Sequence, residues 1–199
     1  MNNYHYIVSS LPALSLDYRF TKETPAEIKE QILELCSERD QKVISFLESG
    51  YLKENMTADF YGEALAHKNP FIRAFFCFDL NVRNAKVEYL NSQLGREKGT
   101  DVVILSEESV EFEESNEVAA ALSSADLLTR ERALDELYWR KIESLTLFNY
   151  FDITAILGFI ARLHIVARWF ELDEQKGREK FRQLVDEVRG TFKGVEYKN

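Results

Sequence analysis

The stretch ITAILGFIARLHIVARWF, residues 153–170, decides the fold of this chain. It is apolar at most positions, and Asp152 directly before it is a good helix N-cap. A membrane-spanning helix needs about 20 apolar residues, whereas this stretch is shorter and carries Arg162, His164 and Arg168, which are costly in lipid. We therefore predict no direct membrane span. The stretch is expected to be the central helix of a soluble bundle. Part of its apolar face could also contact another subunit.

Capping residues predict two further helices in the first 50 residues. Thr24 can cap a helix whose first turn holds Pro25 and Glu27, which is the pattern of a capping box. Asp40 is predicted to cap a second helix, and Gly50 is placed to end it.

Two long helices are predicted in the middle of the chain. Asn69 precedes Pro70, and the helical pattern then continues to Gly95, a length of about 37 Å at 1.5 Å per residue. A second helix is expected over 129–147. The apolar face predicted for the first of them comprises Phe71, Ile72, Phe75, Phe76, Leu80, Val87, Leu90 and Leu94.

Shorter elements complete the expected fold. Residues 4–11 have helical spacing, with a short strand over 4–9 as the alternative, and 102–105 is a strand or a buried loop. A brief helix is expected over 118–122. A last helix after Asp173 would present Phe181, Leu184, Val185 and Val188.

These elements together predict an all-α protein, an elongated helical bundle with several long helices and an acidic connecting segment. We expect residues 1–199 to form a single helical domain. The alternative is two lobes, 1–98 and 125–199, joined by the acidic segment 99–124.

The net charge of −9 is concentrated in that segment. Eight acidic residues and no Lys or Arg lie between Gly99 and Thr129, and outside them 26 acidic residues nearly balance 25 basic ones. A chain without a cluster of basic residues is not expected to bind nucleic acid. The segment is either a solvated loop or a contact for a basic partner. The candidate partner-binding residues are Glu107, Glu108, Glu111, Glu113 and Glu114.

The sequence offers little that points to catalysis, a metal or a cofactor. It has no glycine-rich phosphate loop and no nucleophile elbow. Glu63 and His67 stand four residues apart, but a metal site needs three or four ligands. Cys36 and Cys77 have no Cys or His neighbour in sequence, so we interpret them as reduced core thiols of a cytosolic protein.

Three carboxylates, Asp79, Glu131 and Asp135, could be interpreted as an acid–base set. However, Asp79 precedes Arg83 by four residues, and Asp135 lies in a segment rich in counter-charges, which favours ion pairs on helix surfaces. We therefore predict no catalytic residue, and an enzyme built on these three carboxylates remains the less favoured hypothesis.

Two arginines inside the apolar stretch need partners, because an unpaired buried charge is very costly. For Arg162 and Arg168 the candidate partners are carboxylates on other predicted helices, or one arginine emerges at an interface. Trp139 and Trp169 are core aromatics or interface anchors. The carboxylates considered as partners of Arg162 and Arg168 are Asp79, Asp135 and Glu143.

Three stretches carry a resemblance to a known family. They are YHYIVSSLPALSLD (4–17), FDLNVRNAKVEYLNSQLGRE (78–97) and RERALDELYWRKIESLTLFNYFDITAILGFIARLHIVARWFELDEQKGREKF (130–181). Together they resemble a family of uncharacterised bacterial proteins associated with V-type ATPases, notably in Bacteroidetes. That family in turn resembles a shortened form of the C subunit of V-type ATP synthase, which is called the d subunit in eukaryotes.

The resemblance implies a non-catalytic central-stalk subunit. The C subunit is an all-helical socket that sits on the cytoplasmic side of the membrane rotor ring and receives the shaft. The implied partners are the stalk subunits and the rotor ring, at a cytoplasmic position peripheral to the inner membrane. The alternative from the residues alone is a free-standing cytoplasmic helical adaptor.

Overall fold

The computed structural model describes residues 4–105 and 112–171, and within these ranges it is all-helical. The described residues form eight α-helices and one short 3₁₀ helix, without a strand, which confirms the predicted all-α class. The helices are α1 (Tyr4–Ser10), α2 (Pro25–Leu35), α3 (Glu38–Ser49), α4 (Ala58–Ala66), α5 (Pro70–Leu94), α6 (Ser115–Leu122), α7 (Leu127–Thr146) and α8 (Ile153–Glu171), with η1 (Lys53–Asn55) between α3 and α4.

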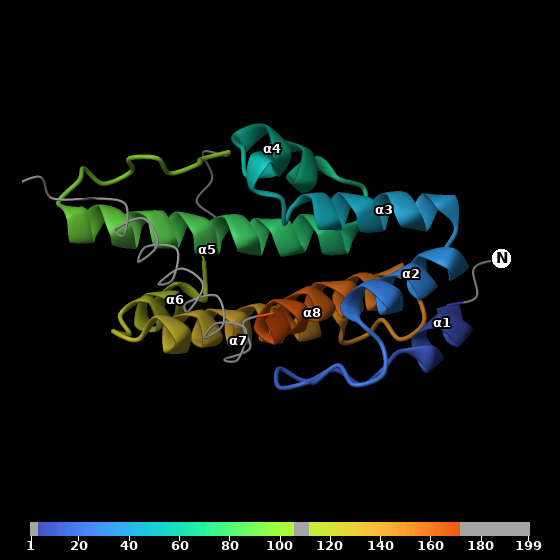
Figure 1. Ribbon diagram of the computed structural model, residues 1–199. Helices are drawn as coiled ribbons and strands as arrows, with labels where there is room; N and C mark the ends of the chain where they lie inside the picture. The colour runs from blue at the N-terminus through green and yellow to red at the C-terminus, as the bar shows by residue number, and fades with distance from the viewer. Residues whose placement is uncertain (1–3, 106–111, 172–199) are drawn as a thin grey trace, which may run out of the picture.

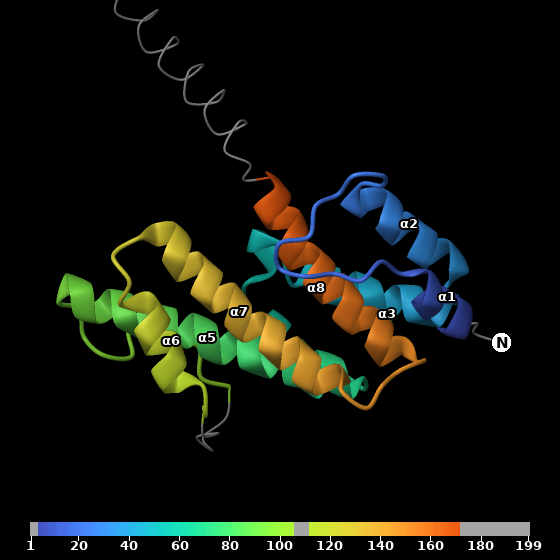
Figure 2. The same ribbon diagram turned by 90° about the horizontal axis from the view of Figure 1, so that it is seen from below.

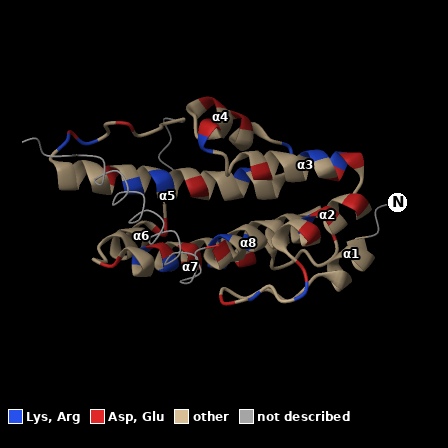
Figure 3. Ribbon diagram, viewed as in Figure 1, with Lys and Arg blue, Asp and Glu red and all other residues tan. Residues whose placement is uncertain are grey.

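The helices pack in two layers (Figure 1). One layer contains α3 and α5 with α4 on their outer side, and the other contains α1, α2, α6, α7 and α8. The two layers meet where α8 packs on α3 and where α7 and α6 pack on α5. Basic and acidic residues are interspersed along the ribbons of α3, α5 and α7 (Figure 3).

Helix α8 is the central helix of its layer, as its apolar sequence predicts. It packs against α1, α2, α3 and α7, and Figure 2 shows it between α2 and α7. Among the described residues it is long and apolar enough to cross a membrane, but 56% of that window is buried by the chain's own helices. Its buried residues are Thr154, Ile156, Leu157, Gly158, Phe159, Ile160, Ala161, Leu163, Ile165 and Val166.

The predicted capping residues are largely where the helices begin and end. Thr24 and Glu27 form a complete capping box, and Asn69 accepts hydrogen bonds from the first turn of α5. Gly95 ends α5 with a φ of 64°, a left-handed conformation that suits glycine. The prediction for α3 was wrong, because Ser37 is its N-cap and Asp40 lies inside the first turn, where it is buried.

The second half of α5 is less buried than its apolar pattern predicts. Leu90 is 53% exposed and Leu94 is 69% exposed, because few helices reach the end of α5. Phe78 and Val82, which lie on another face, are buried against α6 and α7 instead. The buried residues of α5 therefore belong to two separate hydrophobic clusters.

The described residues between α5 and α7, 95–105 and 112–126, include a helix and a segment held by side-chain hydrogen bonds. Residues 102–105 form neither helix nor strand, and Asn84 fixes them through two hydrogen bonds to the backbone of Val103. Helix α6 starts earlier than predicted and buries Val118 and Leu122 against α5 and α7. Asp126 caps α7, which begins at Leu127, two residues before the predicted start. The predicted helix after Asp173 lies outside the described residues.

Candidate functional site

A polar cavity lies where α5, α7 and α8 meet, with Tyr51 and Met56 from the α3–α4 connection on one side. Its volume is about 270 Å³. We call it the central cavity. Its remaining lining residues are Phe75, Asp79, Arg83 and Lys86 of α5, Glu131, Leu134, Asp135 and Tyr138 of α7, and Ala161, His164, Ile165 and Arg168 of α8.

Asp79 is the centre of one hydrogen-bond network in the wall of the central cavity. It is 7% exposed, and it accepts hydrogen bonds from the hydroxyls of Tyr61 at 2.5 Å and Tyr138 at 2.6 Å. The Nε of Arg83 donates to it at 2.6 Å, which is also an ion pair. Burial raises the pKa of both tyrosines, and the negative charge of Asp79 raises it further. Both hydroxyls therefore remain neutral donors.

Asp135 is the centre of a second network on the opposite wall. It is 5% exposed, and it accepts from the indole N–H of Trp169 at 2.6 Å and from the guanidinium of Arg168. The same guanidinium lies 3.8 Å from Glu131. One arginine of α8 thus joins two carboxylates of α7, which fixes the register between these helices.

The three carboxylates of the enzyme hypothesis do share one cavity. Asp79, Glu131 and Asp135 all line it, but each has an arginine within ion-pair distance. An acid–base pair needs one carboxyl group whose proton is free to move to a substrate. Two of these groups instead accept several short hydrogen bonds from their own chain, so the arrangement stabilises the fold.

Within the described residues Arg162 forms no ion pair with the carboxylates predicted for it, although Glu143, one of the three, is close enough for its charge to act on Arg162. Its guanidinium lies over the ring of Trp139, 5.5 Å from the centroid, and its Nε donates to the carbonyl of Gly158 at 3.4 Å. The Trp139 indole donates to Glu143 at 2.9 Å. Burial lowers the pKa of Arg162, and the charge of Glu143 opposes that shift. The helical register of α8 turns Arg162 away from the central cavity, so that of the two arginines of α8 it is Arg168 that lines the cavity.

The acidic candidates divide into three groups. Glu107, Glu108 and Glu111 lie outside the described residues, and Glu113 is exposed. Glu114 forms an ion pair with Lys141 of α7 at 2.7 Å. Nearby Glu117 pairs with Arg140, so the acids next to α6 hold it on α7 and are not all free for a partner.

His67, which the sequence pairs with Glu63 as a possible metal ligand, has a structural role at the end of α4. His67 follows α4 as its C-cap, its Nδ1 accepts from the backbone N–H of Asn69 at 3.0 Å, and its ring stacks on Phe46. Among the described residues, no three His, Cys, Asp or Glu side chains are arranged to hold a metal ion.

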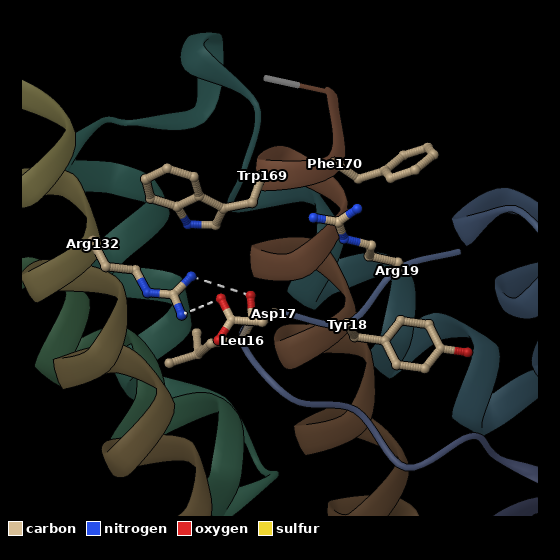
Figure 4. Close-up of a pocket in the computed structure, with 7 residues that line it drawn as sticks. All are labelled: Leu16, Asp17, Tyr18, Arg19, Arg132, Trp169 and Phe170. Atoms are coloured by element: carbon tan, nitrogen blue, oxygen red, sulfur yellow. Dashed lines mark hydrogen bonds and ion pairs between the residues drawn. The ribbon is translucent and has the colours of Figure 1, made fainter. Parts of the chain in front are cut away.

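A second hollow, of about 320 Å³, lies where the 11–24 connection crosses the end of α8 (Figure 4). There Arg132 of α7 binds the carboxylate of Asp17 at 2.7 Å and the carbonyl of Leu16 at 3.2 Å. The guanidinium also lies over the ring of Trp169. These contacts attach the irregular connection to α7 and α8.

The turn between α7 and α8 is the most apolar exposed feature of the described chain. We call Leu147, Phe148, Tyr150 and Phe151 the apolar turn; they are 59%, 84%, 68% and 45% exposed. The turn has a defined conformation, because Asn149 donates to Asp152 at 2.5 Å and Asp152 accepts from the first turn of α8. Sequence reasoning missed this feature, although the letters LFNYF between two helices could have indicated it.

Fold and site together define an all-helical protein with a charge-compensated interior and an exposed apolar turn. The chain belongs to the family described as protein of unknown function (DUF2764), whose profile matches residues 52–191. That range includes the stretches 78–97 and 130–181 and does not include 4–17. No curated protein and no solved structure matches the chain.

Proposed function

We propose that this protein is a non-catalytic central-stalk subunit of a V-type ATPase or ATP synthase, similar to the C subunit. It would couple the shaft to the membrane rotor ring from the cytoplasmic side of the inner membrane. The resemblance of three stretches to proteins associated with V-type ATPases suggests this role. The single structural observation that carries it is the apolar turn.

The apolar turn suits a contact with another protein. Large aromatic side chains anchor protein interfaces, and several exposed together mark a docking surface more often than chance exposure does. The turn is also held at the end of two helices of 20 and 19 residues that are packed along their length. A force applied at the turn would therefore reach the body of the protein through stiff elements, as a coupling protein requires.

The charged interior supports the same role. A protein that carries torque needs helices whose register does not slip. Arg168 of α8 binds Asp135 of α7, and Tyr138 of α7 donates a hydrogen bond to Asp79 of α5. Buried, fully hydrogen-bonded networks favour a single arrangement of the helices.

The test is affinity purification of the tagged full chain from its own cells, followed by identification of its partners by mass. We expect V-type ATPase stalk subunits to co-purify. The double variant Phe148→Ser/Tyr150→Ser should reduce their recovery at least tenfold. The matched control, Leu127→Ser/Leu128→Ser, changes two exposed apolar residues at the other end of α7 and should recover them normally.

Two results would contradict the proposal. Purification of soluble partners without any ATPase component would favour the free-standing adaptor. Equal recovery of ATPase components with both double variants would remove the apolar turn from the interface.

A further inference from the structure

The central cavity contains more hydrogen-bond donors than its own acceptors use. Both oxygens of Asp79 already accept from neighbouring side chains, and one oxygen of Asp135 accepts two hydrogen bonds. Arg83 uses its Nε on Asp79 and one terminal nitrogen on the sulfur of Met56, which leaves its second terminal nitrogen without a hydrogen bond within the described chain. A guanidinium has five N–H donors, so the capacity of Arg83 exceeds what these partners take.

Two further donors line the same cavity. Neither the ammonium of Lys86 nor the hydroxyl of Tyr51 makes a hydrogen bond or a close ion pair to any described residue. Glu131 and Asp79 attract the ammonium without forming an ion pair with it, and Arg83 and Arg168 repel it. Burial lowers the pKa of Lys86 and raises that of Tyr51. The Lys86 side chain is half-buried, and its ammonium has no direct partner within the described chain, so it is available to pair with a negatively charged ligand that enters the cavity.

The stacked ring of His164 completes this part of the wall. It lies on Tyr51 with a centroid separation of 3.7 Å and an interplanar angle of 14°. Burial of the ring, followed by the charge of Arg168, lowers its pKa to about 4. The imidazole is therefore neutral near pH 7, and one of its nitrogens can donate a hydrogen bond. Part of His164 is exposed and Arg168 is 45% exposed, so the cavity has a route to solvent.

We propose that the central cavity is a binding site for a small oxyanion, a phosphate or a short carboxylate, held by Lys86, Tyr51 and the free terminal nitrogen of Arg83. The volume of about 270 Å³ suits a ligand of a few heavy atoms and excludes a nucleotide. Charge-assisted hydrogen bonds from Lys and Arg are the usual means of binding such groups. This inference does not depend on the proposed stalk function.

The test measures thermal unfolding of the purified full chain in inorganic phosphate, in succinate and in sodium chloride, at equal ionic strength. Phosphate or succinate should raise the midpoint in a saturable way, whereas chloride should not. The comparison between phosphate and succinate distinguishes the two sources of the oxyanion.

Two variants and a control make the test specific. Lys86→Met should weaken the apparent Kd at least tenfold, and Tyr51→Phe, which removes only the hydroxyl, should weaken it about threefold. Lys42→Met changes an exposed lysine of α3 outside the cavity and should bind as the wild type does. Absence of a saturable shift with both anions would overturn the proposal, and so would an equal shift in Lys86→Met.

Discussion

At the scale of single residues, Asp79 explains most about the interior. Its carboxylate accepts from Tyr61 of α4, Tyr138 of α7 and Arg83 of its own helix. Removing one donor leaves a buried oxygen unsatisfied, which costs more than the net value of the bond itself. The same reasoning applies to Asp135, which depends on two donors from α8.

The substitution Tyr138→Phe tests this dependence. We expect it to lower the free energy of unfolding by about 1–3 kcal/mol, because Asp79 loses a donor while the ring stays packed. Urea denaturation measures the change. Tyr150→Phe, at a residue that is 68% exposed, is the control and should stay within about 0.5 kcal/mol of the wild type. Equal effects of the two variants would show that the hydroxyl of Tyr138 is not needed.

The pKa of His164 predicts a pH dependence with a definite sign. The folded value is about 4, whereas an unfolded histidine titrates near pH 6.5. Between these values the unfolded chain binds a proton that the folded chain does not, so stability falls as pH falls from about 6.5 to 4. Above about pH 6.5 both states are neutral at this position and the effect vanishes.

His164→Gln should remove that contribution. Urea unfolding at pH 7.5 and at pH 5 should show a larger loss of stability for the wild type than for the variant. An identical loss in both proteins would mean that His164 titrates normally in the folded state.

At the scale of elements, α7 and α8 approach each other closely at Gly158. A Cβ added to Gly158 would lie 2.4 Å from the Cγ2 of Thr146, so only glycine permits this approach. The contact lies next to the apolar turn, and it sets the direction in which the turn projects. A similar approach occurs at Gly50, where an added Cβ would lie 2.3 Å from the ring of Phe76.

Gly158→Ala should therefore destabilise the protein by about 1–3 kcal/mol through overpacking. Adding Thr146→Ser removes the clashing methyl group but keeps a hydroxyl able to bond the carbonyl of Ile142, and it should restore most of the loss. Gly62→Ala is the control in an open position of α4, and it should stabilise by about 0.5–1 kcal/mol. Thermal or urea unfolding gives all three values. If Thr146→Ser does not restore stability, the strain lies elsewhere.

The sequence predicted local features of these elements better than their contacts. The caps at Thr24 and Asn69 and the end at Gly95 depend on neighbouring residues, so they are visible in the letters. Ser37 and Asp40 have the spacing of a capping box, so the local sequence does indicate Ser37 as the cap of α3, and the prediction overlooked it. Helix α4 was missed because it is short and follows an irregular segment.

The site was predicted less well, because its partners come from different helices. Asp79 and Arg83 share one helix, and their spacing alone predicts that they meet. The choice of Arg168 over Arg162 as the partner of Asp135 depends on how α8 is rotated against α7. Periodicity gives the apolar face of a helix but not that rotation to within one side chain.

At the scale of the whole molecule, two helical layers pack through apolar side chains, and the hydrogen bond from Tyr138 to Asp79 also joins them. The apolar turn lies at the end of α7 and α8. The fold does not need the turn for its own core, since most of its side chains are more than half exposed. Such exposure is a liability in a free monomer, and the proposed contact with the stalk would cover it.

The double variant Phe148→Ser/Tyr150→Ser should therefore leave the isolated protein intact. We expect its free energy of unfolding to stay within about 1 kcal/mol of the wild type, because exposed substitutions have small effects. Urea denaturation measures this, and a loss above about 3 kcal/mol would show that the turn is part of the core.

The most direct measurement of the central claim is the number of ions pumped per ATP hydrolysed in inverted membrane vesicles, from cells with and without this chain. If the protein couples the shaft to the rotor ring, vesicles lacking it should hydrolyse ATP with little or no ion pumping, and added purified protein should restore the ratio. The variant Phe148→Ser/Tyr150→Ser should restore it poorly. The same ratio of ions to ATP in both kinds of vesicle would contradict the account.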